Sequence, residues 1–559
     1  MKRHFTISAL CLTGLLHSGS YAQQPILVKD INTGSGNATP KNFTPYNGKL
    51  YFQATDDVNG TELWATDGTD AGTVLVKDIN PGSGSSNPQE FKVYNGKLYF
   101  QADNGVDTVR AELWVSDGTA AGTYMLKRIN TNNTASTLGS IPSGFTECNG
   151  KLYFTARDNG SEGTGDELWV TDGTEAGTHL VKDIRPGFDS GMPSFLTAYN
   201  NKLYFAAEPG TPNTELYVSD GTDAGTFMLK DINNGNSGAP KEFKVYNGKL
   251  YFSANDEIHG RELWVTDGTE AGTNMFKDFY TGPQGGNPKK LTVWNNKLYF
   301  ISGDATNGNN SGLWETDGTL AGTRRVNTAA PVTSWIVSDI YIPYNGKLLM
   351  NASNSAAGDK LYQTDATAAG TVPVVSINNT DNFGDNVRHT AAHNGRAYFT
   401  ADDRTGRGRQ LWVTDGTADS TFILLPTGGA LNNALPYNNE LIDFNGYLFF
   451  TANYKNTTGL ELYKISLPAP QPPTGIEEKN TLSGVSVLPN PVKDELNIRV
   501  AQAGKYDLQI LNAVGATVYS GYCSEKVLKI NTRTFAPGLY IVRIQGDKGA
   551  QSVTRIIKQ

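Results

Sequence analysis

The chain has 559 residues, of which 61 are glycine and 10 % are aromatic, and it carries a formal net charge of −8. This composition, without a long amphipathic helical pattern, predicts an all-β protein of many short strands and tight turns. Residues 1–22 carry +2 and residues 483–559 carry +5, which leaves −15 for residues 23–482. The strongly negative charge of residues 23–482 argues against nucleic acid or an anionic membrane as the main ligand.

Residues 1–22 have the pattern of a secretory signal peptide. Lys2 and Arg3 precede an apolar run, and a small-x-small site predicts cleavage between Ala22 and Gln23. The run falls short of the roughly 20 residues that a spanning helix needs, which favours a signal peptide over a membrane anchor. No other segment is apolar enough to span a membrane, so the mature chain is expected to have no transmembrane segment.

An internal repeat of about fifty residues, the spacing of propeller blades, runs through residues 23–467. The motif NGKLYF at residues 47–52 has eight later copies or relatives. A second motif, ELW, places an aromatic residue nine times, from Trp64 to Tyr463. Both counts predict nine units.

Four strands are predicted in each unit. In the fifth unit they are residues 242–246, 249–254, 262–266 and 273–279, and the first two meet across an Asn-Gly pair that favours a tight hairpin. The segment PILVKDIN near the N-terminus matches a fourth strand, whereas the ninth unit lacks one. The N-terminal strand is therefore expected to complete the last blade and close a propeller of about nine four-stranded blades. An eight-bladed ring with one displaced unit, or two smaller rings, remains open.

The recurrent TDGTxAGT segment connects the third and fourth strands of a unit. Asp and Thr side chains bond neighbouring backbone N–H groups and Gly accepts positive φ, so the motif predicts a structural turn. A shallow cation site is the alternative, but the loops lack the alternating oxygen ligands of an EF-hand. No metal, cofactor or catalytic residue is predicted. The turn aspartates are Asp67, Asp117, Asp172, Asp220, Asp267, Asp317 and Asp415.

Residues 25–467 resemble the ELWxxDGT repeat proteins of bacterial surfaces, most closely at ELWVTDGTEAGTHLVKDI (167–184). The resemblance implies a secreted propeller-like repeat protein but no particular activity. Units six to eight depart from it, because Gly312, Lys360 and Gln410 replace the usual Glu. The seventh unit also has DAT for DGT, and the ninth lacks that motif. These units are expected to pack less regularly or to have specialised.

Variable links at the other end of the blades are the predicted ligand-binding surface, because binding residues favour variable loops on a rigid scaffold. For any one of these residues, a solvated loop charge is the simpler interpretation. The HTAAH segment (389–393) has metal-like spacing but no Glu after the first His and lies in a strand context, so no metal site is expected there. No carboxylate pair stands out as a glycosidase pair. The candidates are Asp56, Arg157, Asp256, His259, Asp402 and Arg404.

Residues 468–482 form a Pro-rich linker, and residues 483–559 are predicted to be a small Ig-like β-sandwich because apolar residues such as Leu508, Ile510 and Val518 alternate with polar ones.

The tail resembles the type A C-terminal sorting domain of the type IX secretion system of Bacteroidetes, with Pro-Asn-Pro (489–491) and Gly-Leu-Tyr (538–540) in the expected order. This resemblance implies export by the signal peptide, transfer across the outer membrane by the type IX machinery, and release or surface attachment.

The sequence therefore predicts an exported surface or extracellular propeller that binds a polysaccharide or a protein. A secreted enzyme acting on glycans and a structural adhesin are the alternatives. Two carboxylates converging with an Arg or His at the central opening would favour the enzyme, whereas a broad aromatic or charged rim would favour binding.

Overall fold

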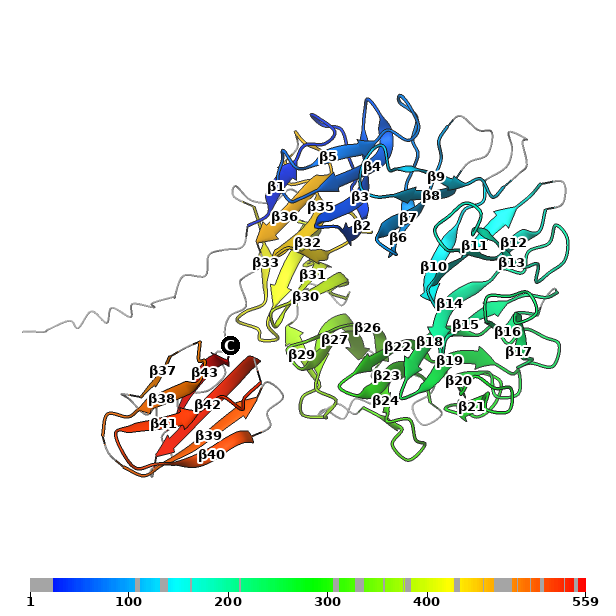
Figure 1. Cartoon of the computed structure of the whole chain (residues 1–559). Helices are drawn as coiled ribbons and strands as arrows, with labels where there is room; N and C mark the ends of the chain where they lie inside the picture. The colour runs from blue at the N-terminus through cyan, green and yellow to red at the C-terminus, as the bar shows by residue number, and fades with distance from the viewer. Residues whose placement is uncertain are drawn as a thin grey trace, which may run out of the picture. The chain divides into compact units, whose positions relative to one another are not determined.

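Strands are the only regular elements among the described residues of the computed structural model (Figure 1), which confirms the all-β prediction. The chain divides into two compact units, Met1–Ala469 and Pro470–Gln559. Within the described part of the chain, no helix is long and apolar enough to cross a membrane. The structure describes residues 24–105, 111–130, 139–160, 163–210, 213–304, 311–326, 336–354, 357–375, 377, 384–426, 433–455, 457–466, 485–489, 491–502, 504–512, 517–536, 538–546 and 551–558.

Three predictions fall outside the described residues. They are the signal peptide at residues 1–22, its cleavage between Ala22 and Gln23, and the linker at residues 468–482.

The first unit contains nine antiparallel four-stranded sheets, which we number along the chain. The first five sheets are β2 (Lys41–Tyr46), β3 (Lys49–Asp56), β4 (Gly60–Thr66) and β5 (Val74–Lys77); β6 (Gln89–Tyr94), β7 (Lys97–Ala102), β8 (Glu112–Ser116) and β9 (Tyr124–Lys127); β10 (Ser143–Cys148), β11 (Lys151–Asp158), β12 (Gly165–Thr171) and β13 (His179–Lys182); β14 (Ser194–Tyr199), β15 (Lys202–Ala207), β16 (Glu215–Ser219) and β17 (Phe227–Lys230); and β18 (Lys241–Tyr246), β19 (Lys249–Asn255), β20 (Arg261–Thr266) and β21 (Asn274–Lys277).

Sheets six to nine continue the pattern, except that the fourth strand of the ninth sheet comes from the N-terminus. They are β22 (Lys289–Trp294), β23 (Lys297–Ser302), β24 (Gly312–Thr316) and β25 (Arg324–Arg325); β26 (Ile336–Tyr344), β27 (Lys347–Asn354), β28 (Ala357–Thr364) and β29 (Val372–Val375); β30 (Arg388–His393), β31 (Arg396–Asp402), β32 (Arg409–Thr414) and β33 (Phe422–Leu424); and β34 (Ile442–Phe444), β35 (Tyr447–Ala452), β36 (Glu461–Ser466) and β1 (Ile26–Lys29).

The hairpin between the first two strands of the fifth sheet has the expected Asn-Gly geometry. Asn247 and Gly248 have φ of 46° and 70°, the left-handed values that a two-residue turn of this type requires. The fourth strand of this sheet, β21, ends at Lys277 rather than at residue 279. It is shorter than predicted because the chain then turns inward, where the Tyr280 N–H donates to Glu262 at 3.1 Å.

Apolar side chains fill every space between consecutive sheets. The second strands are buried on both faces, as in β7, where Leu98, Tyr99 and Phe100 are each at most 1 % exposed. The buried side chains form nine clusters in this unit, and each cluster joins two successive sheets. One of them joins the ninth sheet to the first, because Phe449 and Leu462 pack with Leu50 and Phe52.

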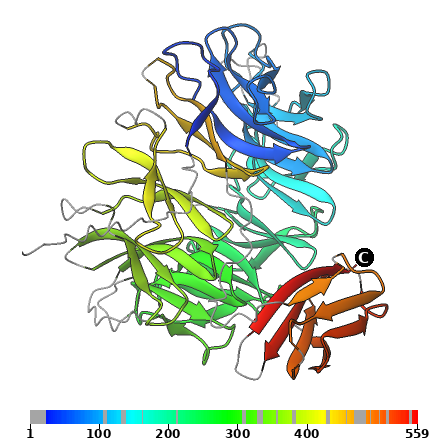
Figure 2. The same cartoon turned by 90° about the vertical axis from the view of Figure 1, so that its left-hand side faces the viewer.

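The N-terminal strand β1 pairs antiparallel with β36, as the repeat count predicts (Figures 1 and 2). Ile26 lies opposite Lys464 and Leu27 lies opposite Tyr463. Just after β1, the Ile31 N–H donates to the carboxylate of Glu461 at 2.8 Å across 430 residues of sequence. Strand pairing and a buried hydrogen bond therefore attach the N-terminal segment to the ninth sheet.

The Glu of the ELW motif ties each sheet to the link that leaves it. In the first sheet Glu62 is fully buried and accepts hydrogen bonds from the Ile79 N–H at 2.8 Å and the Ser86 hydroxyl at 2.6 Å. Burial raises the pKa of this carboxyl to about 7. The ELW motif alone does not predict this role. Its equivalents are Glu112, Glu167, Glu215, Glu262 and Glu461, with pKa values raised by burial to between about 7 and about 8.

Two of the units that depart from the motif replace this Glu by a buried ion pair. In the sixth sheet a Cβ on Gly312 would lie 2.3 Å from Arg325, whose side chain fills the space and pairs with Asp304 at 2.5 Å. In the seventh sheet Lys360 stands in place of Glu and lies 3.2 Å from the fully buried carboxylate of Asp385. Asp385 occupies the position of Ser86, since its N–H donates to the carbonyl of the residue before Lys360. In the first unit the carboxylate is on the motif strand and the hydrogen-bond donor is on the link. In the seventh unit the cation is on the motif strand and the carboxylate is on the link.

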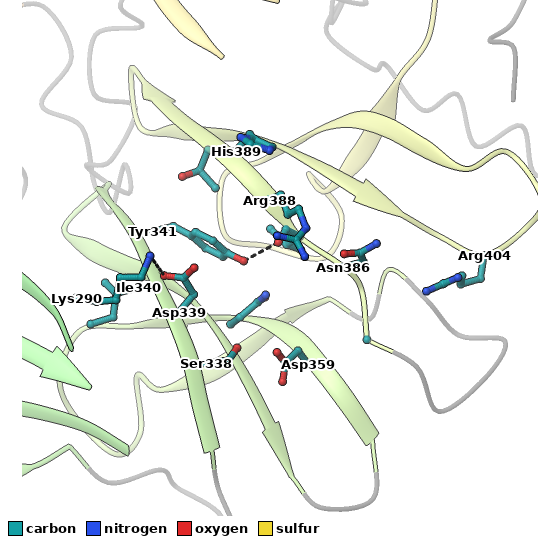
Figure 3. A pocket seen from close by; sticks show the side chains of 14 residues that line it. Lys290, Ser338, Asp339, Ile340, Tyr341, Asp359, Asn386, Arg388, His389 and Arg404 are labelled. Carbon is teal, nitrogen blue, oxygen red and sulfur yellow. Dashed lines mark hydrogen bonds and ion pairs between the residues drawn. The ribbon is translucent and has the colours of Figure 1, made fainter. Parts of the chain in front are cut away.

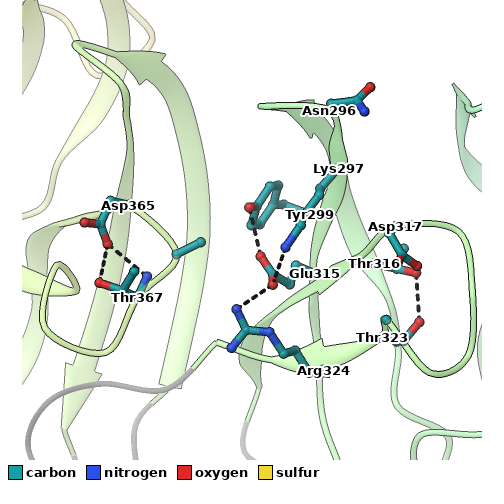
Figure 4. Close-up of polar contacts among 12 residues, drawn as sticks. Asn296, Lys297, Tyr299, Glu315, Thr316, Asp317, Thr323, Arg324, Asp365 and Thr367 are labelled. Carbon is teal, nitrogen blue, oxygen red and sulfur yellow. Dashed lines mark hydrogen bonds and ion pairs between the residues drawn. The ribbon is translucent and has the colours of Figure 1, made fainter.

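The alanine that replaces glycine in the DAT sequence of the seventh unit is accompanied by a change in the sixth sheet, which packs against it. In the earlier turns a tyrosine of the preceding sheet packs against the glycine of DGT, so that a Cβ on Gly118 would lie 2.4 Å from the Tyr51 hydroxyl. The seventh unit has Ala366 at this position, with φ of 68°. Its preceding tyrosine, Tyr299, instead donates to Glu315 at 2.9 Å (Figure 4).

Glu315 takes the place of the apolar residue after the motif Trp. It is fully buried and pairs with Lys297 at 2.8 Å and Arg324 at 2.7 Å (Figure 4). Tyr299 and Ala366 belong to one buried cluster, so the hydrogen bond to Glu315 lets the tyrosine accommodate the extra methyl group of Ala366.

Replacing Glu315 with Val is expected to lower the free energy of unfolding by about 1–3 kcal/mol, because the buried Tyr299 hydroxyl loses its acceptor. The double variant Glu315→Val, Ala366→Gly restores the pairing of the earlier turns and is expected to recover most of this loss. Ala366→Gly alone is expected to change the value by less than about 1 kcal/mol. Urea denaturation followed by tryptophan fluorescence measures all three, and a double variant no better than Glu315→Val would refute the coupling.

The C-terminal unit contains a three-stranded and a four-stranded antiparallel sheet around one buried cluster. Leu508 and Ile510 are buried in it, but Val518 is 39 % exposed, contrary to the predicted alternation. A register shift after Ile510 pairs that residue with Tyr519, so Tyr519 turns to the core and Val518 away from it. The strands are β37 (Ser486–Leu488), β38 (Glu495–Arg499), β39 (Tyr506–Asn512), β40 (Thr517–Cys523), β41 (Val527–Asn531), β42 (Gly538–Gly546) and β43 (Gln551–Lys558).

Candidate functional site

The aspartates of the DGT loops bond within their own turns. Asp67 accepts hydrogen bonds from the Thr69 N–H at 2.8 Å and the Thr69 hydroxyl at 2.7 Å, and these bonds hold its pKa below the usual range. The same Asp–Thr contacts recur at Asp117, Asp172, Asp220, Asp267, Asp317, Asp365 and Asp415. No group of three or more His, Cys, Asp or Glu that could hold a metal ion occurs among the described residues.

Four of the six predicted contact residues belong to the first, third and fifth sheets, which do not form the cavities described below. Their side chains form hydrogen bonds or ion pairs with residues close to them in sequence. Asp56 accepts the Val58 N–H at 2.9 Å. Arg157 forms an ion pair with Asp166.

The other two of these four contact each other. Asp256 accepts from the His259 ring at 2.7 Å, and this bond raises the His259 pKa. Neither residue lines one of the cavities described below.

The remaining two border two neighbouring cavities: Asp402, the last residue of β31, lines one, and Arg404, two residues later, lines the other. The Arg404 N–H donates to Asp402 at 2.9 Å, and its side chain lies 3.9 Å from the same carboxylate. Only this pair of the predicted residues is therefore brought to a concave surface among those described.

The larger cavity, which we call the Tyr341 cavity, has a volume of about 760 Å³ and is formed mainly by the first strands of the seventh and eighth sheets, β26 and β30 (Figure 3). It is lined by Lys290, Ser338, Asp339, Ile340, Tyr341, Asn351, Asp359, Gly384, Asn386, Val387, Arg388, His389, Thr390 and Arg404.

Two carboxylates, those of Asp339 and Asp359, line this cavity, and only the first has an ion-pair partner among the described residues. Asp339 lies 3.2 Å from the Lys290 ammonium, whereas Asp359 has no hydrogen bond or ion pair to its carboxylate within the described part of the chain. The Tyr341 hydroxyl donates to the Val387 carbonyl at 2.7 Å, and the Tyr341 side chain is drawn close to that of Asp339 in Figure 3. Burial raises the pKa of Tyr341, and the charges of Asp339 and Asp359 raise it further.

Buried polar atoms without partners also line the Tyr341 cavity. The Ser338 hydroxyl and the Asn351 side-chain oxygen make no hydrogen bond within the described residues, and Asn351 is only 7 % exposed. A buried polar atom without a partner costs about 1–3 kcal/mol, so such atoms are commonly satisfied by water or a ligand.

A second cavity of about 530 Å³, which we call the Tyr437 cavity, shares Asn386 with the first. Tyr437 is 56 % exposed, and its ring centroid lies 4.2 Å from the Arg388 guanidinium and 5.4 Å from that of Arg409. His389 lies 2.9 Å from the Tyr437 carbonyl, and burial together with the two arginines lowers the pKa of this histidine. The two cavities thus share Asn386, and Arg388 of the Tyr341 cavity lies over the aromatic ring of the Tyr437 cavity.

The two histidines of HTAAH have different partners. His393 contacts the Asp443 carboxylate of the ninth sheet, whereas His389 contacts the Tyr437 carbonyl. The i, i+4 spacing therefore does not bring the two rings to one set of ligands.

Sequence analysis missed most of the residues in these cavities. Asp339, Asp359, Arg388 and Tyr437 come from three units and share no spacing motif. The one available signal was the departure of units six to eight from the repeat, since these units supply every residue that lines the Tyr341 cavity.

Comparison with known proteins identifies the tail. Residues 486–559 match the secretion system C-terminal sorting domain. The resemblance to a type IX sorting domain is thereby confirmed for these residues, and the protein is handled by the type IX machinery and sent to the cell surface or secreted. No curated protein matches the chain.

Several solved structures show weak similarity. PorZ, a surface component of the type IX secretion system of Porphyromonas gingivalis, is 14 % identical with a TM-score of 0.32, over 92 % of this chain and 75 % of that one. Prolyl oligopeptidase B from Galerina marginata is 11 % identical with a TM-score of 0.37, over 66 % of this chain and 55 % of that one. A puromycin hydrolase is 12 % identical with a TM-score of 0.35, over 68 % and 61 %. Similarity at this level does not bear on activity.

Proposed function

We propose that this chain is an exported ELWxxDGT repeat protein whose residues 23–467 form a closed nine-bladed β-propeller. Nine successive sheets, nine inter-sheet clusters and the β1–β36 pairing support closure. Residues 1–22 act as the signal peptide, residues 468–482 as the linker, and residues 483–559 as a small Ig-like sorting domain. The DGT aspartates serve as turn formers rather than ligands.

The proposed activity of the propeller is to bind a polysaccharide outside the cell. The observation that carries it is the composition of the neighbouring Tyr341 and Tyr437 cavities. Within the described part of the chain, they combine buried polar atoms without hydrogen-bond partners, the Asp359 carboxylate without an ion-pair partner, and an exposed tyrosine ring. Sugars present many hydroxyl groups and apolar ring faces, and a site of fixed polar groups beside an aromatic ring matches both. A protein ligand would bind mainly through its surface and is less suited to hydrogen-bond polar atoms buried inside a cavity, such as those of Ser338 and Asn351.

Glycan-array binding of residues 23–559 tests this proposal. Selective binding is expected, and Asp359→Asn is expected to weaken it at least tenfold because the acceptor facing the sugar loses its charge. Asp56→Asn, in a turn of the first sheet away from both cavities, is the matched control and should bind normally. An array without any selective binding would refute the proposal, and loss of binding with a chelator would show that a cation takes part.

Hydrolysis of the bound glycan is the second candidate function. It is favoured by the two carboxylates, Asp339 and Asp359, in one cavity with Arg388 and His389, which is the arrangement that glycosidases require in general terms. Release of reducing ends from array-positive glycans would support it if both Asp339→Asn and Asp359→Asn abolish release while one of them retains binding. Glycan binding without release of reducing ends would show that the protein binds glycans and does not hydrolyse them.

A further inference from the structure

Arg388 and Arg409 differ from the other cations around the two cavities. Lys290 is paired with Asp339, and Arg404 lies beside Asp402. No carboxylate of the described residues lies within ion-pair distance of Arg388 or Arg409.

The surroundings hold these two guanidiniums in place without neutralising them. Arg409 is only 5 % exposed, and one of its nitrogens donates to the Asn386 carbonyl at 2.9 Å and to the Thr400 hydroxyl at 3.0 Å. Arg388 lies over the Tyr437 ring and lines the Tyr341 cavity. A cation–π contact of this kind fixes the orientation of the guanidinium and leaves its N–H donors available.

The charge of this region is the opposite of that of its surroundings. Four cations and three carboxylates border the two cavities, namely Lys290, Arg388, Arg404 and Arg409 against Asp339, Asp359 and Asp402. The excess is +1, within a segment of the chain that carries −15. The buried Arg409 guanidinium, which has no carboxylate within ion-pair distance among the described residues, is costly to maintain. Arg388 lies over the same Tyr437 ring and is exposed, so an external anion can reach this pair of positive charges.

We propose that the glycan bound here is acidic, and that Arg388, supported by Arg409, binds the carboxylate of a uronic acid unit. The planar guanidinium presents paired N–H donors that match the two oxygens of a carboxylate. Tyr437 is a positioning residue, because its ring holds Arg388 at the boundary between the cavities. Asp359 and the Asn351 oxygen then accept hydrogen bonds from the hydroxyl groups of the neighbouring sugar. This assignment rests on the proposed glycan binding.

The test compares polygalacturonate with the same polymer after full methyl esterification, which removes the charge and keeps the sugar. Calorimetry on the full mature chain is expected to show binding at least tenfold tighter for the acid than for the ester. Arg388→Gln is expected to abolish that preference, and Tyr437→Leu to reduce it by displacing the guanidinium. Arg407→Gln is the matched control, since this exposed arginine, between β31 and β32 of the same sheet, lines neither cavity.

Equal binding of acid and ester would overturn the inference while leaving glycan binding intact. The same holds if Arg388→Gln and Arg407→Gln weaken acid binding equally, because the effect would then be one of general charge. If the array finds selective glycans but none with a carboxylate, the acidic assignment alone fails, whereas an array without any glycan ligand removes the proposed function as well. Thermal denaturation of each variant confirms that a loss of binding is not a loss of folding.

Discussion

Replacing Lys360 with Ala is expected to lower the free energy of unfolding by about 3 kcal/mol or more. Lys360 is the cation facing the fully buried Asp385, and removing one partner of a buried ion pair typically costs about 3–5 kcal/mol. Asp385 also accepts a hydrogen bond from the Leu361 N–H at 3.1 Å, within the inner strand β28, so the loss of Lys360 also disturbs the sheet. Urea denaturation followed by tryptophan fluorescence measures the change.

The repeat supplies a matched control for this prediction. The double variant Lys360→Glu, Asp385→Ser recreates the pair formed by Glu62 and Ser86 in the first sheet. It is expected to be more stable than Lys360→Ala, and also more stable than Lys360→Glu, which places two carboxylates together. If the double variant is no better than Lys360→Glu, the exchange of polarity inferred for the seventh sheet is wrong.

The protein is expected to lose stability as the pH rises from about 5 to about 8. Six buried motif glutamates have pKa values raised from the ordinary 4.5 to about 7 or 8, because burial disfavours the charged form. A raised folded-state pKa gives a stabilisation that is complete below the unfolded value of 4.5 and is lost as the pH passes through 7–8. All six groups act in the same direction, so the Tm is expected to fall by several degrees over this range.

The DGT aspartates act in the opposite sense at lower pH. Their pKa values lie below the ordinary 3.8, so their contribution is present above that value and is lost as the pH falls through the folded-state values. Calorimetry across pH 3–9 should therefore show maximum stability near pH 4–5, and a Tm that is flat or rising between pH 5 and 8 would contradict the prediction.

One substitution isolates a single motif glutamate. Glu167→Gln keeps an acceptor but cannot ionise, and Gln410 occupies this position naturally in the eighth sheet. The variant is expected to lose less stability between pH 5 and 8 than the native chain. An unchanged pH dependence would show that this carboxyl does not titrate in that range.

Local sequence chemistry predicted the repeating part of the fold. The Asn-Gly pairs determine the hairpins, because both positions adopt positive φ. The unit lacking a fourth strand and the spare strand at the N-terminus predicted the pairing of β1 with β36. The hairpin signal is a local backbone preference, and the pairing signal comes from comparing copies of one repeat, so neither requires knowing which distant side chains meet.

The features that depend on distant residues were not predicted. The role of Glu62 requires knowing that the link carrying Ile79 and Ser86 passes over it. Alanine can replace glycine at position 366 because Tyr299, in the preceding unit, hydrogen-bonds to Glu315 instead of packing on this turn. The cavities are assembled from single side chains on three sheets, and no spacing within one unit encodes such a site.

The attachment of β1 to β36 also affects the order in which the molecule can be assembled. The first strand of the chain must wait for a partner that follows about 430 residues later, as the Ile31–Glu461 contact shows. During that interval both ends of the growing array present unpaired strand edges, the surfaces on which chains of this kind aggregate. The long separation also makes the final pairing slow, since a large loop must close before its contacts form. The chain is therefore most exposed to aggregation in the interval before its last sheet is completed.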